Sequence, residues 1–188
     1  MALNDKPAWI GTQAAQPASG TVTLDADYTK YPDFRLKFTL DAARISVTDA
    51  AGSGSYGALK LFDFNESAIS ILGCRQNYTA FAEGAALTGA AGDAVFDIGV
   101  GSVAKAAAAD GALGGATDDD IGGEIAITLS GGTGTGTLVT GAGLGLNGTA
   151  TAADIVVNWS GTAATIDANS TIDVTGEIEV HGRMLGDD

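Results

Sequence analysis

The sequence is poor in basic residues, cysteine, histidine, proline and aromatic residues. Its 188 residues include 9 Lys and Arg against 23 Asp and Glu, which gives a net charge of −14. Nucleic acid is an unsuitable partner for such a chain, because phosphate binding needs clustered Lys and Arg. The single cysteine, Cys74, excludes an intrachain disulfide. With His181 as the sole histidine, a zinc finger and a catalytic triad with several histidines are excluded as well.

The sequence also lacks a hydrophobic run of the kind that crosses a membrane as a helix. The first residues, Met1 to Pro7, have no apolar stretch, so a Sec-type signal peptide is not expected. The longest uncharged run extends from Ile125 to Ala153, but more than half of its residues are Gly or Thr. Such a composition favours turn-rich sheet over a membrane helix. We therefore expect no membrane partner.

Alternation of apolar and polar residues predicts β-strands along most of the chain. The clearest case is 171–180, where every second residue from Ile172 to Val180 is apolar or Gly and the residues between are Thr, Asp or Glu. Further strands are expected at 34–40, 45–47, 59–64, 67–74, 94–100, 125–129 and 155–159, with a hairpin connection at 49–55. Trp159 is expected in the core. Many short strands separated by Gly- and Thr-rich turns predict an all-β fold, a β-sandwich of jelly-roll type.

Two segments do not follow this alternation. Residues 1–20 contain Pro7 and Pro17 and show no period, so we expect an extended N-terminal arm that precedes a single domain over 21–188. Its only large apolar residues, Trp9 and Ile10, are candidate anchors in another subunit, although packing of Trp9 on its own domain is an equal alternative. The Ala-rich stretch 102–110 predicts one short helix with Ser102 as its N-cap.

Charge is distributed unevenly between the two parts of the chain. Residues 1–75 are nearly neutral, whereas residues 76–188 hold most of the negative charge. The acidic part favours solubility, so the near-neutral part is the better docking surface. Together with Trp9 and Ile10, we expect Arg35, Lys37 and Arg44 to contact a partner or another subunit.

No combination of residues indicates an active site. Asp118, Asp119 and Asp120, with Glu124 nearby, are weak candidates for a calcium or magnesium site, but a solvated acidic loop explains them better. His181 has no identifiable catalytic partner and is interpreted as structural or exposed. Cys74 adjoins Arg75, which would lower the thiol pKa, yet its apolar strand favours a buried, inert thiol. We expect no enzymatic activity and no cofactor.

Several short motifs resemble small structural proteins of tailed bacteriophages. They are Asp97–Ser102 followed by an Ala-rich stretch and Leu113, then Ala116–Ile121, Leu146–Ala150, Asp154–Asn158, Val174–Val180 and the ending Gly186–Asp188. The similarity covers roughly residues 34–188, and the arm lies outside it. The family is that of head decoration, or cement, proteins, which have no catalytic motif to transfer.

This resemblance implies a non-enzymatic virion protein on the outer surface of the capsid. Such proteins are β-rich, form trimers or dimers, and bridge neighbouring subunits of the major capsid protein. For this chain the expected partners are the major capsid protein and further copies of itself, with a homotrimer favoured over a dimer. The alternatives are another virion component, such as a tail tube or head fibre, and a carbohydrate- or receptor-binding β-sandwich module. An enzyme on a β scaffold is the remaining alternative.

Overall fold

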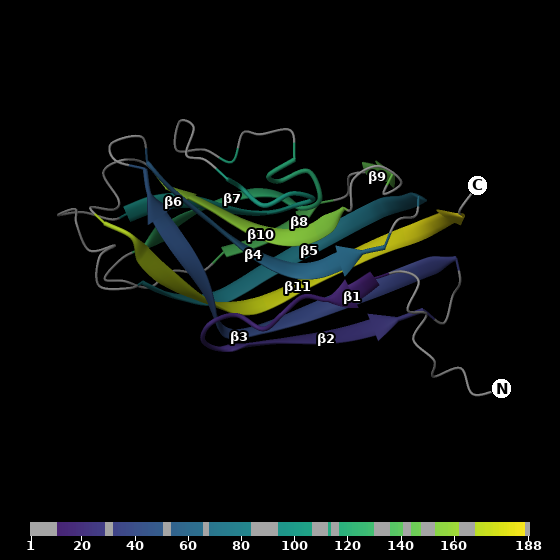
Figure 1. The fold of residues 1–188 in the computed structure, drawn as a ribbon, viewed down its shortest axis with the longest axis horizontal. Coiled ribbons are helices and arrows are strands. Elements are labelled where there is room, and N and C mark those ends of the chain that lie inside the picture. The colour runs from purple at the N-terminus through teal and green to yellow at the C-terminus, as the bar shows by residue number, and fades with distance from the viewer. Residues whose placement is uncertain are drawn as a thin grey trace.

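The computed structural model describes residues 11–28, 32–50, 54–65, 68–83, 94–106, 113, 117–129, 136–140, 144–147, 153–161 and 168–186. All regular elements in this part of the chain are strands, so the expected all-β class is confirmed (Figure 1). They are β1 (Gly11–Gln13), β2 (Thr21–Asp27), β3 (Asp33–Asp49), β4 (Ser55–Phe64), β5 (Ala68–Glu83), β6 (Ala94–Gly101), β7 (Gly123–Leu129), β8 (Gly136–Thr140), β9 (Leu144–Asn147), β10 (Asp154–Gly161) and β11 (Ser170–Gly186).

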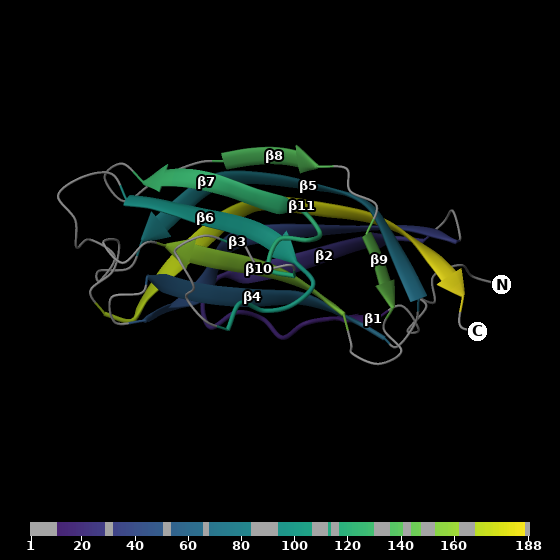
Figure 2. The same ribbon diagram turned by 90° about the horizontal axis from the view of Figure 1, so that it is seen from above.

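The strands form one antiparallel sheet that curls on itself. Its order is β7-β6-β10-β4-β3-β11-β5-β8, with β1, β2 and β9 paired to β4, β3 and β5 respectively. The end strands β7 and β8 lie side by side, so the two ends of the sheet meet (Figure 2). β3 and β4 pair from Val47 opposite Gly57 to Asp49 opposite Ser55, which confirms the predicted hairpin. The inner face of the curled sheet encloses one hydrophobic cluster.

The two long central strands, β3 and β11, carry the clearest alternation of buried and exposed residues. In β11 the predicted apolar positions from Ile172 to Val180 are all buried. In β3 the buried positions shift by one residue after Leu40, because the pairing with β11 contains a bulge around Ala42. Ala42 has a φ of 48°, an uncommon value for a residue with a side chain. The bulge bends β3 and returns Ala43, Ile45 and Val47 to the core.

Aromatic side chains fill much of the core. Trp159 on β10 is 1% exposed and stacks on Phe96 of β6 with ring centroids 3.6 Å apart. Its predicted core position is therefore confirmed. A second group joins β3 to β4, where Phe62 contacts the rings of Phe38 and Phe64 edge to face. Edge-to-face and stacked pairs add stabilisation beyond the area that they bury.

One buried amide connects opposite ends of the curled sheet. The Gln76 side chain on β5 donates hydrogen bonds of 2.8 and 3.1 Å to the carbonyl oxygens of Gly122 and Gly123, at the start of β7. The Tyr78 hydroxyl in turn donates to Gln76 Oε1 at 2.8 Å. Burial raises the pKa of Tyr78 well above its ordinary value, so the hydroxyl stays protonated and remains a donor.

The outer face of β6 and β10 is covered by residues 102–106, 113 and 117–120. Because Gly99 and Gly101 on β6 have no side chains, the covering residues can pack closely against the backbone of this strand. A Cβ atom on Gly101 would lie 2.3 Å from the carbonyl oxygen of Thr117. Asn158 of β10 is fully buried beneath the cover, which explains why β10 is buried on both faces.

The helix predicted over 102–110 is wrong for its described part, residues 102–106, which are not helical. The backbone N–H of Ser102 donates to Asp120 Oδ1 at 2.7 Å, and that of Lys105 donates to Asn158 Oδ1 at 2.8 Å. These tertiary hydrogen bonds outweigh the local helix propensity of alanine. Residues 107–110 lie outside the described part of the chain. Within the described ranges, no helix is long and apolar enough to cross a membrane.

The described half of the expected N-terminal arm, residues 11–20, lies on the domain itself. β1 pairs with the end of β4, from Gly11 opposite Phe64 to Gln13 opposite Phe62. The Gln16 side chain donates to the Val22 carbonyl oxygen at 2.9 Å and accepts from the Val22 N–H at 2.8 Å, so it caps the outer edge of β2. The domain boundary at residue 20 stays a prediction.

Candidate interaction surface

The outer face of β2, β3, β11 and β5 is a broad surface of charged and threonine side chains. The alternation of each strand places these residues outward, while their neighbours enter the core. The pairing register aligns one outward residue from each strand in a row: Asp25, Lys37, Glu179 and Arg75. We call this row and the two rows beside it the charged face; the two rows are Thr23, Thr39, Glu177 and Asn77 on one side and Asp27, Arg35, His181 and Gly73 on the other.

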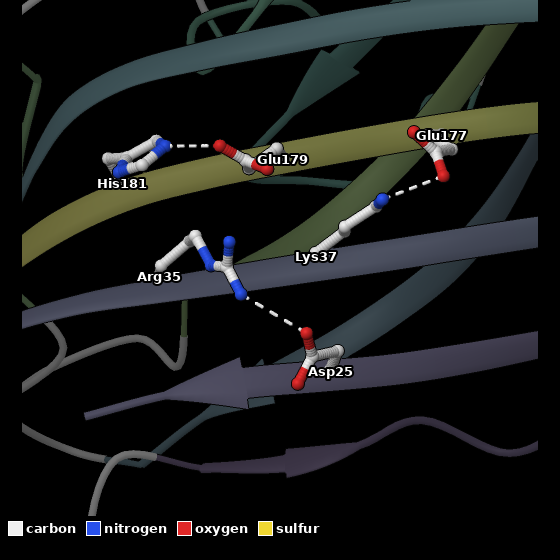
Figure 3. A network of polar contacts seen from close by, with 6 residues as sticks. All are labelled: Asp25, Arg35, Lys37, Glu177, Glu179 and His181. Carbon is white, nitrogen blue, oxygen red and sulfur yellow. Dashed lines mark hydrogen bonds and ion pairs between the residues drawn. The ribbon is translucent and has the colours of Figure 1, made fainter. Parts of the chain in front are cut away.

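Two ion pairs on the charged face run diagonally between neighbouring rows (Figure 3). Arg35 pairs with Asp25 at 3.1 Å, and Lys37 pairs with Glu177 at 2.7 Å. His181 Nε2 lies 2.6 Å from Glu179 Oε1 on the same strand. The predicted interface residues Arg35 and Lys37 thus share one face, and each already has a carboxylate neighbour.

Arg44, the third predicted cation, lies on the same outward side of β3 beyond the Ala42 bulge. Its guanidinium forms two hydrogen bonds of 2.7 Å to the carboxylate of Asp173 on β11. This contact raises the pKa of Arg44, first through the hydrogen bond and then through the charge of Asp173. All three predicted cations are therefore part of mixed-charge pairs and not of a positive patch.

Sequence reasoning missed the acidic partners of these cations as site residues. The alternation of the final strand predicts that Asp173, Glu177 and Glu179 face the solvent. It does not predict which residues of β3 lie opposite them. Arg75 is one of the basic residues of the near-neutral part that the sequence offers as a docking surface, but its place opposite Glu179 was not predicted. Cross-strand register, which depends on the whole sheet, is what brings these charges together.

Exposed leucines form a second feature, at the end of the sheet where β5 begins and β11 ends. Leu72 is 48% exposed and Leu185 is 60% exposed, and Arg183 lies outward between them. The Arg183 side chain pairs with Asp33 at 2.6 Å. We call Leu72, Arg183 and Leu185 the leucine end.

The N-terminal residues attach at this same end of the molecule. β1 begins at Gly11, opposite the last residue of β4, Phe64. β5 begins shortly afterwards at Ala68, opposite Gly186 at the end of β11. The predicted anchors Trp9 and Ile10 lie outside the described residues, so their position stays a prediction.

The acidic segment 118–120 belongs to the cover over β6 and β10. Asp118 Oδ2 pairs with Lys105 Nζ at 3.0 Å, and Lys105 is only 5% exposed in its side chain. Asp120 accepts two hydrogen bonds of 2.7 Å from the N–H and hydroxyl of Ser102. Among the residues that the structure describes, no group of three or more His, Cys, Asp and Glu is placed to hold a metal ion.

The protonation of the acidic segment reflects its partial burial. Desolvation raises the pKa of Asp119, and the negative charges of Glu124, Asp118 and Asp120 raise it further. Desolvation also raises the pKa of Asp120, although the hydrogen bonds from Ser102 oppose this shift. The arrangement ties two loops to the sheet, and its carboxylates are engaged by protein donors.

Two single residues considered as chemical candidates have structural environments. Cys74 is 3% exposed, which confirms its expected burial, and burial raises the pKa of its thiol to about 12. Its low reactivity stays a prediction. His181 lies within β11 on the charged face, so the final strand extends beyond its predicted end at residue 180. Its side chain is half exposed, as one of the two expected positions, and its structural role stays a prediction.

The function of the chain is therefore argued from the charged face, the leucine end and the fold, because comparison with known proteins identifies no relative. No protein-family model matches the chain, and no curated protein matches it at a significant level.

Proposed function

We propose that this chain is a non-enzymatic virion protein that decorates the outer surface of a bacteriophage capsid. In this role it bridges neighbouring subunits of the major capsid protein and resists their separation under the pressure of packaged DNA. The proposal is supported by the resemblance of its motifs to head decoration proteins and by its all-β fold. It is also supported by the charged face and the leucine end, two exposed surfaces with charged and apolar side chains that can contact another protein.

The observation that carries the proposal is the leucine end. Leu72 and Leu185 are two of the three exposed large hydrophobic residues in the described part of the chain, and they lie on adjacent strands with Arg183 between them. The buried core of a protein–protein interface is more apolar than the remaining surface, and Arg is enriched there. Gly11, where β1 begins, pairs with Phe64 at this end, and the proposed anchors Trp9 and Ile10 precede it directly in the sequence.

We also propose that the curled sheet is a β-sandwich of jelly-roll type. The supporting observation is that the buried Gln76 side chain on β5 bonds to Gly122 and Gly123, before and at the start of β7, although these strands are distant in the sheet order. Two layers facing each other across one core are the defining arrangement of a sandwich.

The partners proposed with this role are the major capsid protein and further copies of the chain, without nucleic acid, membrane or cofactor. The net charge of −14 supports the exclusion of nucleic acid, because released counterions favour only basic surfaces. Contacts repeated at many copies of one lattice add through avidity, so each contact can be modest.

The test uses particles from which the protein has been stripped. Purified full-length chain is added back, and both binding and the temperature of particle rupture are measured. We expect rebinding and a higher rupture temperature for the wild type, and loss of both for L72D/L185D. The matched control is V103D, because Val103 is similarly exposed but lies in the cover over β10. Unchanged rupture with and without the wild-type protein overturns the proposal.

A further inference from the structure

The four side chains in the central row of the charged face alternate in charge, so that the row is complementary in charge to the same row read in the opposite direction. Asp25 lies opposite Lys37, Lys37 opposite Glu179, and Glu179 opposite Arg75, on strands β2, β3, β11 and β5. The signs along the row are therefore negative, positive, negative, positive. Read backwards, every position carries the opposite sign.

We propose that the charged face is a contact between two copies of this chain, related by a two-fold axis parallel to the strands. Such an axis reverses the row in the second copy while it keeps the strand direction. Asp25 then faces Arg75 of the second copy, and Lys37 faces Glu179 of the second copy. Each of these contacts occurs twice, as a two-fold interface requires.

The rows on either side are compatible with this arrangement. On one side Thr23, Thr39, Glu177 and Asn77 are aligned, so the Thr39 hydroxyl faces the Glu177 carboxylate of the second copy. On the other side Arg35 faces His181 of the second copy. With His181 counted as neutral, no two like charges oppose each other in these three rows.

Arg75 is the residue on which the contact most depends. It is exposed, and within the described part of the chain it forms no ion pair. Its neighbour across the strands, Glu179, is engaged by His181. A second copy that brings Asp25 to Arg75 supplies the carboxylate that this guanidinium lacks. Charge complementarity of this kind sets the specificity and orientation of an interface.

The arrangement fits the distribution of charge and the leucine end. Most of the charge of −14 resides in residues 76–188 and opposes self-association in general, whereas the charged face carries both signs. An axis parallel to the strands keeps both leucine ends at the same end of the pair, where the two can reach one capsid surface. Sheet twist makes the stacked faces diverge toward their ends, which leaves the leucine ends accessible.

The charged face is thus the proposed site of the self-association that forms part of the proposed function. The contact rests on that function only for its biological setting. A two-fold contact produces a dimer, so it differs from the homotrimer expected from the sequence resemblance. The oligomeric state of the purified chain therefore separates the two.

The test is a charge swap followed by sedimentation velocity over a range of concentrations. The wild-type chain should form a dimer that weakens as salt screens the pairs. R75D and D25R should each weaken dimerisation by about tenfold or more, because each places like charges opposite one another. The double variant D25R/R75D should restore the dimer, since the exchanged residues again have opposite signs. E124K, which reverses an exposed charge on β7, is the matched control and should leave the dimer unchanged.

The outcomes separate this contact from the proposed function. A wild-type monomer, a trimer indifferent to the swap, or a double variant that fails to restore the dimer while remaining folded overturns the contact. Folding of each variant is checked by its thermal unfolding temperature. A chain that dimerises as described but does not bind particles overturns the proposed function and leaves the contact standing.

Discussion

The amide nitrogen of Gln76, fully buried on β5, lies 2.8 Å from the carbonyl oxygen of Gly122, just before β7 begins. These residues belong to opposite ends of the sheet order. The hydrogen bond therefore holds the curled sheet in its closed form, together with the bond that Tyr78 donates to the same side chain.

Replacing Gln76 by Met should destabilise the fold, although Met fills a similar volume. The substitution leaves the carbonyl oxygens of Gly122 and Gly123 and the Tyr78 hydroxyl without this partner. Unpartnered buried polar groups cost about 1–3 kcal/mol each, so for these three groups we expect a loss of about 3 kcal/mol or more in the free energy of unfolding. Urea denaturation measures it. Equal stability of Q76M and wild type would show that the bond does not hold the sheet closed.

Asn158 should hold the cover on β6 and β10. Its side chain accepts from the Lys105 N–H and donates to the carbonyl oxygens of Val103 and Asp118, each at 2.8 Å. We expect N158A to lower the free energy of unfolding by about 2–4 kcal/mol, since the buried Lys105 N–H and two partly buried carbonyl oxygens lose a partner. Hydrogen exchange should show early loss of protection at the Lys105 amide. Protection unchanged from wild type would contradict this role.

Asp97 should make stability depend on pH. Partial burial raises the pKa of its carboxyl above 3.8, so the folded chain binds this proton more tightly than the unfolded chain. The resulting penalty is absent below the unfolded pKa and complete above the folded pKa. D97N should therefore unfold at a higher denaturant concentration than wild type at neutral pH, with no difference well below 3.8. A gain that persists at the acidic pH would contradict this explanation.

The Cys74 thiol should be unreactive in the folded chain. Its pKa of about 12 and its burial leave little thiolate at about pH 8. We expect a thiol reagent to label Cys74 only when urea unfolds the protein. The double variant L72C/C74A is the control, because its cysteine occupies an exposed position on the same strand, and it should react at once. Comparable labelling rates in the two folded proteins would refute the prediction.

Much of the fold was predictable because strand alternation is a local pattern. The buried positions of β11 and the first half of β3 follow directly from their sequences, as does the core position of Trp159. The hairpin between β3 and β4 is also marked by its Gly- and Ser-rich connection. These features depend on neighbours within a few residues, which a sequence displays.

The remaining features depend on residues far apart in the chain. The segment 102–106 has the composition of a helix, but Asp120 and Asn158 take its backbone hydrogen bonds. The bulge at Ala42 and the ion pair of Arg44 with Asp173 depend on the register of β3 with β11. No local pattern specifies these pairings, so the charged face could be only partly predicted from its cations.

The most direct test of the proposed role is the stoichiometry of this chain in purified phage particles, measured by quantitative mass spectrometry against the major capsid protein. A decoration protein should be present in a fixed, high ratio, with a copy associated with each repeating position of the lattice. A few copies per particle would instead indicate a tail or fibre component, and absence from the particle would contradict the virion assignment altogether.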